Sequence, residues 1–173
     1  MYLIKHLFIS LLNKWFWFQY LWILKNKKKI VFFDIDNTLA DTWQSLNLKF
    51  PSEKKRILSL PHFQKVVDVI KKYEKDEYLI IFLSVRPYSQ YLSTKRWIYN
   101  IGILNFTVFL VKKPDDKLLF LEKISHDISF YDDLSYNQEN GELKFYNNVI
   151  ERLKLLPNIT YYDYNYLKTL QKL

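Results

Sequence analysis

The sequence of 173 residues contains no cysteine, three histidines and two glycines. The lack of cysteine excludes disulfide bonds, thiolate catalysis and zinc–cysteine sites. The histidines, at positions 6, 62 and 126, do not have the spacing of a histidine-based zinc site. Few glycines and prolines, with a hydrophobic content of 49%, indicate an ordered globular chain of the length of one domain.

Acidic residues are also scarce relative to basic ones. Lysine and arginine number 26 against 18 aspartates and glutamates, which gives a net charge of +8. This excess is compatible with binding to nucleic acid or to an anionic membrane, and equally with a lysine-rich background composition. We therefore keep nucleic acid as a partner that the sequence allows but does not favour.

The segment that organises the chain is an apolar run at 30–33 followed by Asp34-x-Asp36-x-Thr38. The run predicts a short strand that is buried on both faces. Asp34 and Asp36 point to the same side if the chain stays extended, at the strand end where open parallel sheets bind ligands. Two carboxylates there repel each other unless a cation lies between them or one holds a proton. The alternative is an acidic turn with no chemical role.

This segment resembles the first motif of the haloacid dehalogenase-like (HAD) phosphohydrolases. The resemblance implies that Asp34 is the nucleophile that becomes a phospho-aspartate and that Asp36 is the general acid/base. It also implies that Thr38 contacts the substrate.

A second apolar run, at 78–83, predicts the next strand and leads into Ser84-Val85-Arg86-Pro87. A hydroxyl at the end of this strand can donate a hydrogen bond to a phosphoryl oxygen, or it can cap the following helix. The segment resembles the second HAD motif, often Thr-Gly-Arg-Pro, with Val85 as a departure. This implies a catalytic role for Ser84, whereas Arg86 either contacts the substrate or braces the loop.

The third HAD motif is a lysine near the start of a helix. Lys117 heads the predicted helix at 118–124 and is our choice, with Lys112 and Lys113 as alternatives. In the family this ammonium neutralises the aspartates and holds the phosphate.

The fourth motif is an acidic pair after a strand. Asp132 and Asp133 follow the apolar residues that begin at 128. By resemblance, Asp133 is the direct magnesium ligand and Asp132 the supporting acid, although the reverse assignment is open. A turn with two capping acids is the alternative.

The order of the elements predicts an α/β fold. Strands at 30–33, 78–83, 106–111, 159–162 and from 128 alternate with helical segments, which indicates a Rossmann-like three-layer sandwich with a mainly parallel five-stranded sheet. The roughly forty residues between the first two motifs must also supply a helix, so we expect no separate cap domain. The catalytic domain is predicted to span 30–173.

Residues 1–29 are predicted to form a separate apolar and aromatic helix with a basic end. Its apolar part, at 7–24, is barely long enough to cross a bilayer and has Lys14 near its middle, so a spanning helix is not expected. A secretory signal is not expected either, because no small-residue cleavage site follows. The helix either lies on an anionic membrane surface or packs on the domain or in an oligomer interface.

Taken together, the motifs predict a magnesium-dependent phosphomonoester hydrolase. Asp34, the backbone carbonyl of Asp36, and Asp133 are expected to bind Mg²⁺, with Asp132 beside them. The expected substrate is a phosphorylated sugar or polysaccharide precursor; the alternatives are a nucleotide or polynucleotide 3′-phosphatase and a non-catalytic binding module. We expect a cytoplasmic protein, with association at the inner membrane surface as an option.

Overall fold

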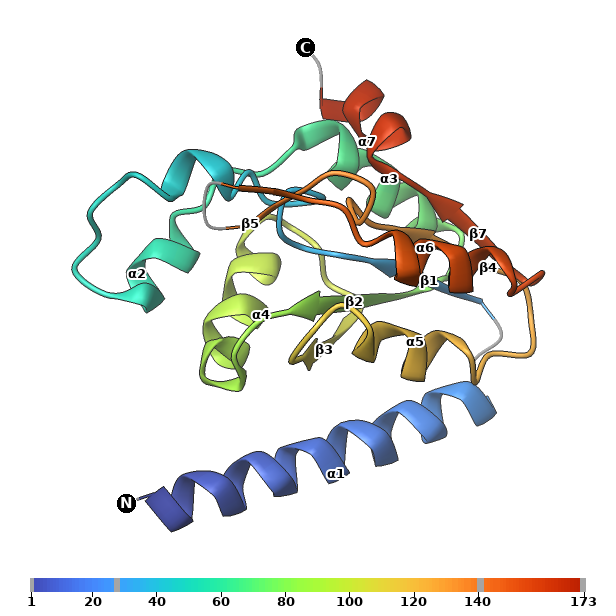
Figure 1. The fold of residues 1–173 in the computed structure, drawn as a ribbon, viewed down its shortest axis with the longest axis horizontal. Helices are drawn as coiled ribbons and strands as arrows, with labels where there is room; N and C mark the ends of the chain where they lie inside the picture. The colour runs from blue at the N-terminus through green and yellow to red at the C-terminus, as the bar shows by residue number, and fades with distance from the viewer. Residues whose placement is uncertain (1, 27–28, 140–141, 172–173) are drawn as a thin grey trace.

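The computed structural model of the protein describes residues 2–26, 29–139 and 142–171, which form a parallel sheet with helices on both faces (Figure 1). The strands and helices have the following bounds: α1 Tyr2–Asn26, β1 Ile30–Phe33, η1 Trp43–Ser45, α2 Glu53–Leu58, α3 Gln64–Lys75, β2 Leu79–Val85, η2 Tyr88–Gln90, α4 Tyr91–Asn100, β3 Phe106–Val111, α5 Asp116–Leu121, β4 Ile128–Tyr131, β5 Asn137–Glu139, β6 Glu142–Lys144, α6 Asn147–Lys154, β7 Ile159–Tyr162 and α7 Tyr164–Gln171.

The main sheet has the order β3-β2-β1-β4-β7, and each neighbouring pair is parallel. Strand β1 is central, and all four of its residues are fully buried. Its in-register neighbours are β2 and β4, with Phe33 opposite Phe82 and Tyr131. The carboxyl ends of the three strands therefore face the same edge of the sheet, and β2 extends three residues further than β1.

Helices cover both faces of this sheet. In Figure 1, α3 and α7 lie above the sheet and α1 and α5 below it. Helix α3 has apolar residues spaced for one face, and it buries Val66, Val67 and Ile70. On the opposite side, the aromatic rings of α1 meet those of β3 and α5, as described next.

Helix α1 is part of the core. Phe16, Tyr20 and Ile23 are buried, and the Phe16 and Tyr20 rings each lie 5.6 Å from the Phe109 ring of β3. The Tyr20 hydroxyl donates a 2.6 Å hydrogen bond to the backbone carbonyl of Phe120 in α5. Neither α1 nor any other described helix has the length and apolar character that crossing a membrane requires.

The fold confirms the predicted α/β architecture with a parallel five-stranded sheet. Two features were not predicted. The segment after the first motif contains a short helix, α2, in addition to α3. Ser52 caps α2 by accepting a hydrogen bond from the backbone N–H of Lys55. A small antiparallel hairpin, β5–β6, follows the acidic pair.

Candidate active site

The end of β1 delivers two carboxylates to the edge of the sheet. Asp34 still belongs to the sheet ladder, because its backbone N–H donates to the carbonyl of Tyr131 at 2.8 Å. The chain then turns tightly, with the backbone N–H groups of Leu39 and Ala40 both donating to the carbonyl of Ile35. Asp34 is therefore fixed by the strand, and Asp36 lies in the turn that follows.

Asn37 closes this turn in the left-handed region, with φ of 56°, a conformation that asparagine tolerates better than most residues. The Thr42 hydroxyl donates to its side-chain oxygen at 2.8 Å, and the Gln171 amide of α7 donates to its backbone carbonyl at 2.6 Å. The turn after β1 is thus braced from both its own loop and the C-terminal helix.

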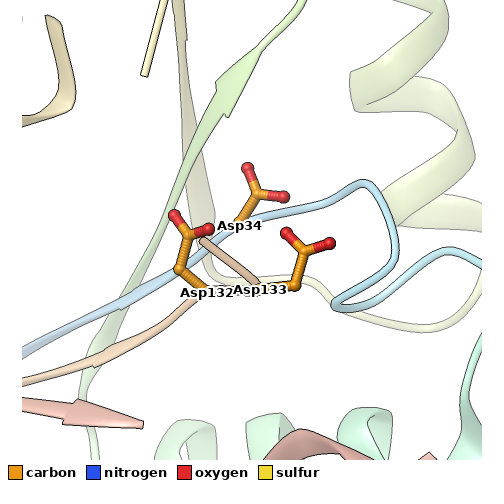
Figure 2. A group of neighbouring side chains, drawn as sticks. All are labelled: Asp34, Asp132 and Asp133. Atoms are coloured by element: carbon orange, nitrogen blue, oxygen red, sulfur yellow. The ribbon is translucent and has the colours of Figure 1, made fainter. Parts of the chain in front are cut away.

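Three carboxylates meet beside the end of β1. Asp34, Asp132 and Asp133 are buried and each offers an oxygen within 4.8 Å of the others (Figure 2). Lys117 of α5, only 2% exposed, donates to Asp34 Oδ1 at 2.8 Å and to Asp132 Oδ2 at 2.6 Å. Lys112 and Lys113, by contrast, are both exposed. The structure thus places the ammonium of Lys117, and neither alternative lysine, among the aspartates.

This crowding changes the acidity of the cluster. Burial raises the pKa of Asp34, and the nearby charge of Asp36 adds to the rise, while Lys117 opposes it. Burial likewise raises the pKa of Asp132 to about 7 and the pKa of Asp133 well above its ordinary value. Burial alone would lower the pKa of Lys117, but the charges of Asp132 and Asp34 outweigh it and raise that pKa. One ammonium therefore compensates three buried acids only in part.

The donor set fits a hard divalent cation. All three groups are carboxylates, which Mg²⁺ and Ca²⁺ prefer. Asp132 Oδ1 is buried and accepts no hydrogen bond from the described residues. The other oxygen of Asp132 accepts a hydrogen bond from Lys117. That Asp133 is the direct ligand and Asp132 the supporting acid stays a prediction.

We expect stability to report the cation. An acid whose pKa is raised in the folded protein binds more protons in the folded state than in the unfolded state. The stability of the metal-free protein should therefore fall as the pH rises from about 4, the ordinary pKa of an aspartate. This fall should continue towards about 7, the pKa of Asp132 in the folded protein. The melting temperature without metal should be lower at about pH 8 than at about pH 5.5. Added Mg²⁺ should raise it by roughly 2–8 °C at the higher pH and much less at the lower one. Differential scanning calorimetry with and without chelator measures the melting temperature and its change on adding Mg²⁺. Equal changes in melting temperature at the two pH values would contradict the metal site.

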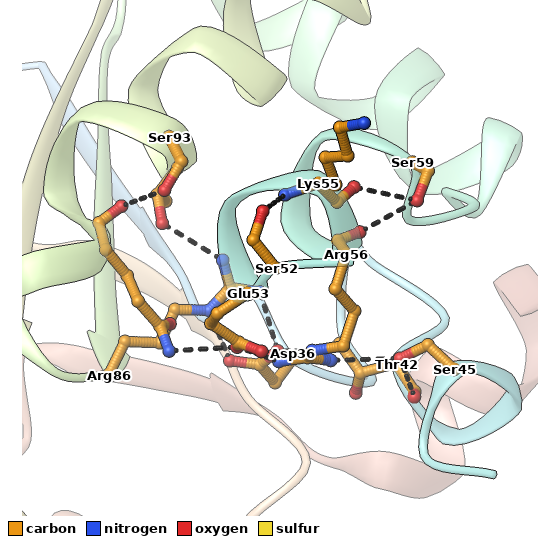
Figure 3. Close-up of polar contacts among 12 residues, drawn as sticks. Asp36, Thr42, Ser45, Ser52, Glu53, Lys55, Arg56, Ser59, Arg86 and Ser93 are labelled. Carbon is orange, nitrogen blue, oxygen red and sulfur yellow. Dashed lines mark hydrogen bonds and ion pairs between the residues drawn. The ribbon is translucent and has the colours of Figure 1, made fainter. Parts of the chain in front are cut away.

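Asp36 is held by a different partner. The Arg86 side chain, which is buried, donates from Nε to Asp36 Oδ2 and from Nη2 to Oδ1, both at 2.6 Å (Figure 3). Its remaining nitrogen, Nη1, donates to Thr94 of α4 at 3.1 Å. Such a bidentate pair fixes the orientation of a carboxylate as well as its position. Arg86 lines the open cavity that lies over these carboxylates. Its three nitrogens are nevertheless directed at protein groups.

The other predicted residues have mixed positions. Ser84, at the end of β2, is buried, lines the cavity and lies 3.4 Å from Asp36 Oδ2. Thr38, predicted to contact the substrate, is fully buried and is not among the residues that line the cavity; its hydroxyl has no hydrogen-bond partner in the described part of the chain. Its place in the turn that folds back on Ile35 explains this burial.

An open cavity of about 310 Å³ lies over these groups. Asp34, Asp36, Ser84, Arg86 and Lys117 line it. Further polar and charged lining comes from the segment after β1, from α2 and from η2, and includes Asn37, Thr42, Arg56 and Gln90.

Sequence reasoning missed Arg56. It donates from two nitrogens to Glu53 in the same helix and from Nη1 to the Ser45 hydroxyl at 2.9 Å (Figure 3). The run of charges at 52–56 was its only signal.

The Arg86–Asp36 pair gives a test between a bracing and a binding role. Arg86→Lys keeps the charge but loses the two-pronged geometry. If Arg86 positions Asp36, turnover should fall by about 10- to 100-fold with KM within about threefold of the wild type. Steady-state kinetics separate the two parameters, and Arg96→Lys, exposed on α4, is the matched control. A rise in KM with unchanged turnover would instead place Arg86 against the substrate.

Comparison with known proteins adds the family. Residues 31–151 match the family described as PITM 1-3, LNS2 domain, over more than half of the chain. The chain belongs to the LNS2 domain family. This LNS2 domain is a HAD-type phosphatase domain, which confirms the resemblance inferred from the four motifs. The matched segment contains Asp34, Arg86, Lys117 and the acidic pair.

Solved structures support the fold of this LNS2 domain. A chain of the Pnkp1/Rnl/Hen1 complex superposes with a TM-score of 0.54 and 21% identity, over 80% of this chain and 47% of that one. Class C acid phosphatase from Bacillus anthracis, with tungstate bound, gives a TM-score of 0.50 and 18% identity, over 83% and 70% of the two chains. The LNS2 domain thus spans about half the length of the first structure it matches. No curated protein matches it.

Proposed function

We propose that this LNS2 domain hydrolyses phosphomonoesters with the help of Mg²⁺, through an acyl phosphate formed on the Asp34 carboxylate. The observation that supports this most directly is the placement of the buried Asp34 carboxylate at the cavity floor, with Oδ1 held by the Lys117 ammonium. A carboxylate fixed in this way is positioned to attack, and the ammonium beside it offsets the charge of an incoming phosphate.

The residues divide the two steps between them. In the first, an oxygen of Asp34 bonds to phosphorus while the bond from phosphorus to the substrate alcohol oxygen breaks, and Asp36 supplies the proton to that oxygen. In the second, Asp36 takes a proton from water, the water oxygen bonds to phosphorus, and the Asp34 carboxylate is released. Ser84 and Lys117 donate hydrogen bonds to the phosphoryl oxygens.

Asp36 accepts one hydrogen bond from Arg86 on each of its oxygens. Each oxygen keeps a second lone pair that can take part in these transfers. Asp34 and Asp133, with the Asp36 carbonyl, would hold Mg²⁺. The bound cation supplies charge stabilisation for the transferring phosphoryl group.

The cavity favours a small polar substrate. Its volume of about 310 Å³ and the polar residues in its lining, which include Asn37, Arg56 and Gln90, suit a phosphorylated sugar or a polysaccharide precursor. A second candidate is a nucleotide or polynucleotide 3′-phosphatase. The net charge of +8 and the structural likeness to the Pnkp1/Rnl/Hen1 complex, described in another structure as an RNA repair complex, support it.

A substrate screen tests the proposal. Phosphate release is measured with Mg²⁺ across phosphorylated sugars, nucleotides and 3′-phosphorylated oligonucleotides, with Asp34→Asn as the blank. Turnover of sugar phosphates that disappears in the blank supports the first candidate, and selective turnover of the oligonucleotides supports the second. Folded protein that releases no phosphate from any class would contradict the hydrolase and favour a binding module.

A further inference from the structure

Helix α1 has a second apolar face that is largely exposed to solvent. Leu11, Trp15, Phe18 and Trp22 follow a spacing of three or four residues and are all exposed, Phe18 by 72%. The buried residues of the helix, such as Phe16 and Tyr20, lie on the opposite side. We call the four exposed residues the outer stripe. In Figure 1, α1 forms the lower edge of the molecule, and the described chain places no element beyond it.

The charges beside the outer stripe all have one sign. Lys14 and Lys25 are exposed on α1, and the helical spacing places them next to Phe18 and Trp22. Residues 1–33 contain six lysines and no aspartate or glutamate. The helix therefore presents aromatic side chains bordered by cations.

The apolar surface continues beyond α1. A cavity of about 370 Å³ lies between the helix and the segment at 88–92, lined by Leu12, Trp15, Tyr91 and Leu92 among others. Leu92 is itself largely exposed. This segment begins two residues after Arg86, so the apolar surface reaches the edge of the active site.

We propose that the outer stripe docks this domain on an anionic lipid surface. Tryptophan and phenylalanine insert at the depth of the lipid headgroups, and the neighbouring lysines gain from the negative surface potential. A second copy of the chain fits less well, because a two-fold contact through this face would bring two lysine-bordered helices together with no carboxylate on either. The proposal does not depend on the phosphatase activity.

Sedimentation of the full chain with vesicles tests the docking. The protein should bind vesicles of phosphatidylcholine mixed with phosphatidylglycerol at least about tenfold more strongly than vesicles of phosphatidylcholine alone. Phe18→Ser combined with Trp22→Ser should weaken binding by at least about tenfold. Leu155→Ser, on an exposed residue outside α1, is the matched control and should change little. All three residues are exposed, so these variants should fold.

Further measurements test the contributions of the lysines and of Trp22, and they distinguish lipid binding from dimerisation. Lys14→Gln with Lys25→Gln should reduce binding and its dependence on salt. Brominated lipids should quench the fluorescence of the wild type more than that of Trp22→Phe. Equal binding to neutral and anionic vesicles would overturn the proposal. So would an absence of vesicle binding together with a concentration-dependent dimer, measured by analytical ultracentrifugation, that the Phe18→Ser/Trp22→Ser variant abolishes.

Discussion

Asp34→Asn is expected to lower phosphate release by about 10⁴-fold or more while making the metal-free protein more stable. An amide cannot form the acyl phosphate, so the loss should appear in turnover. The same change removes one of three crowded acids whose pKa values burial raises, and Asn can still accept the hydrogen bond from Lys117. We expect a gain of about 0.5–2 kcal/mol in the free energy of unfolding at about pH 8.

Activity and stability must therefore change in opposite directions. Phosphate release with Mg²⁺ and chemical denaturation in chelator measure the two quantities on the same preparation. Asp127→Asn is the matched control, because Asp127 is exposed and lies outside the carboxylate cluster. An Asp34→Asn protein that retains activity would refute the nucleophile, and one that loses both activity and stability would refute the electrostatic crowding.

Lys117→Met should have the largest effect on stability. The ammonium is buried and is the cation that binds both Asp34 and Asp132. Methionine has a similar length but no charge, and it would leave three buried carboxylates without this counter-ion. Removing one partner of a buried ion pair costs about 3–5 kcal/mol, and phosphate binding should weaken together with turnover, by about 10³-fold in kcat/KM.

The pH dependence makes this prediction specific. Without the ammonium, the remaining acids should destabilise the fold most when ionised, so the loss should be larger at about pH 8 than at about pH 5. Chemical denaturation at both values measures it. Lys112→Met removes an exposed charge five residues away and should change stability by less than about 0.5 kcal/mol. A Lys117→Met variant as stable as the wild type would show that the cluster does not need this cation.

Local patterns carried most of the fold. The apolar run at 106–111 coincides with β3, because strands buried in a parallel sheet are continuously apolar. The run at 159–162 coincides with β7, an edge strand that is only partly buried. The roles of Asp34 and Lys117 came from family resemblance rather than from spacing, and the structure brings the two groups together across 83 positions of sequence.

What the sequence could not provide depends on contacts between distant residues. Nothing near Arg86 indicates that its guanidinium reaches Asp36, because the pair joins two different strand ends. The brace from Gln171 to the turn at Asn37 spans 134 positions and leaves no local pattern. The later turns of α1 carry apolar residues on nearly all sides. Only the tertiary structure separates the buried face of this helix from its exposed one.

The packing of α1 has a practical consequence for protein engineering. The family match begins at residue 31, so an expression fragment trimmed to that boundary would omit the whole helix. Phe109 and Phe120 would then lose the rings of Phe16 and Tyr20 that now cover them, and the fragment would present a new aromatic surface to water. Such a surface promotes aggregation. Low yields from that fragment would reflect a core cut in two, not an unstable catalytic fold.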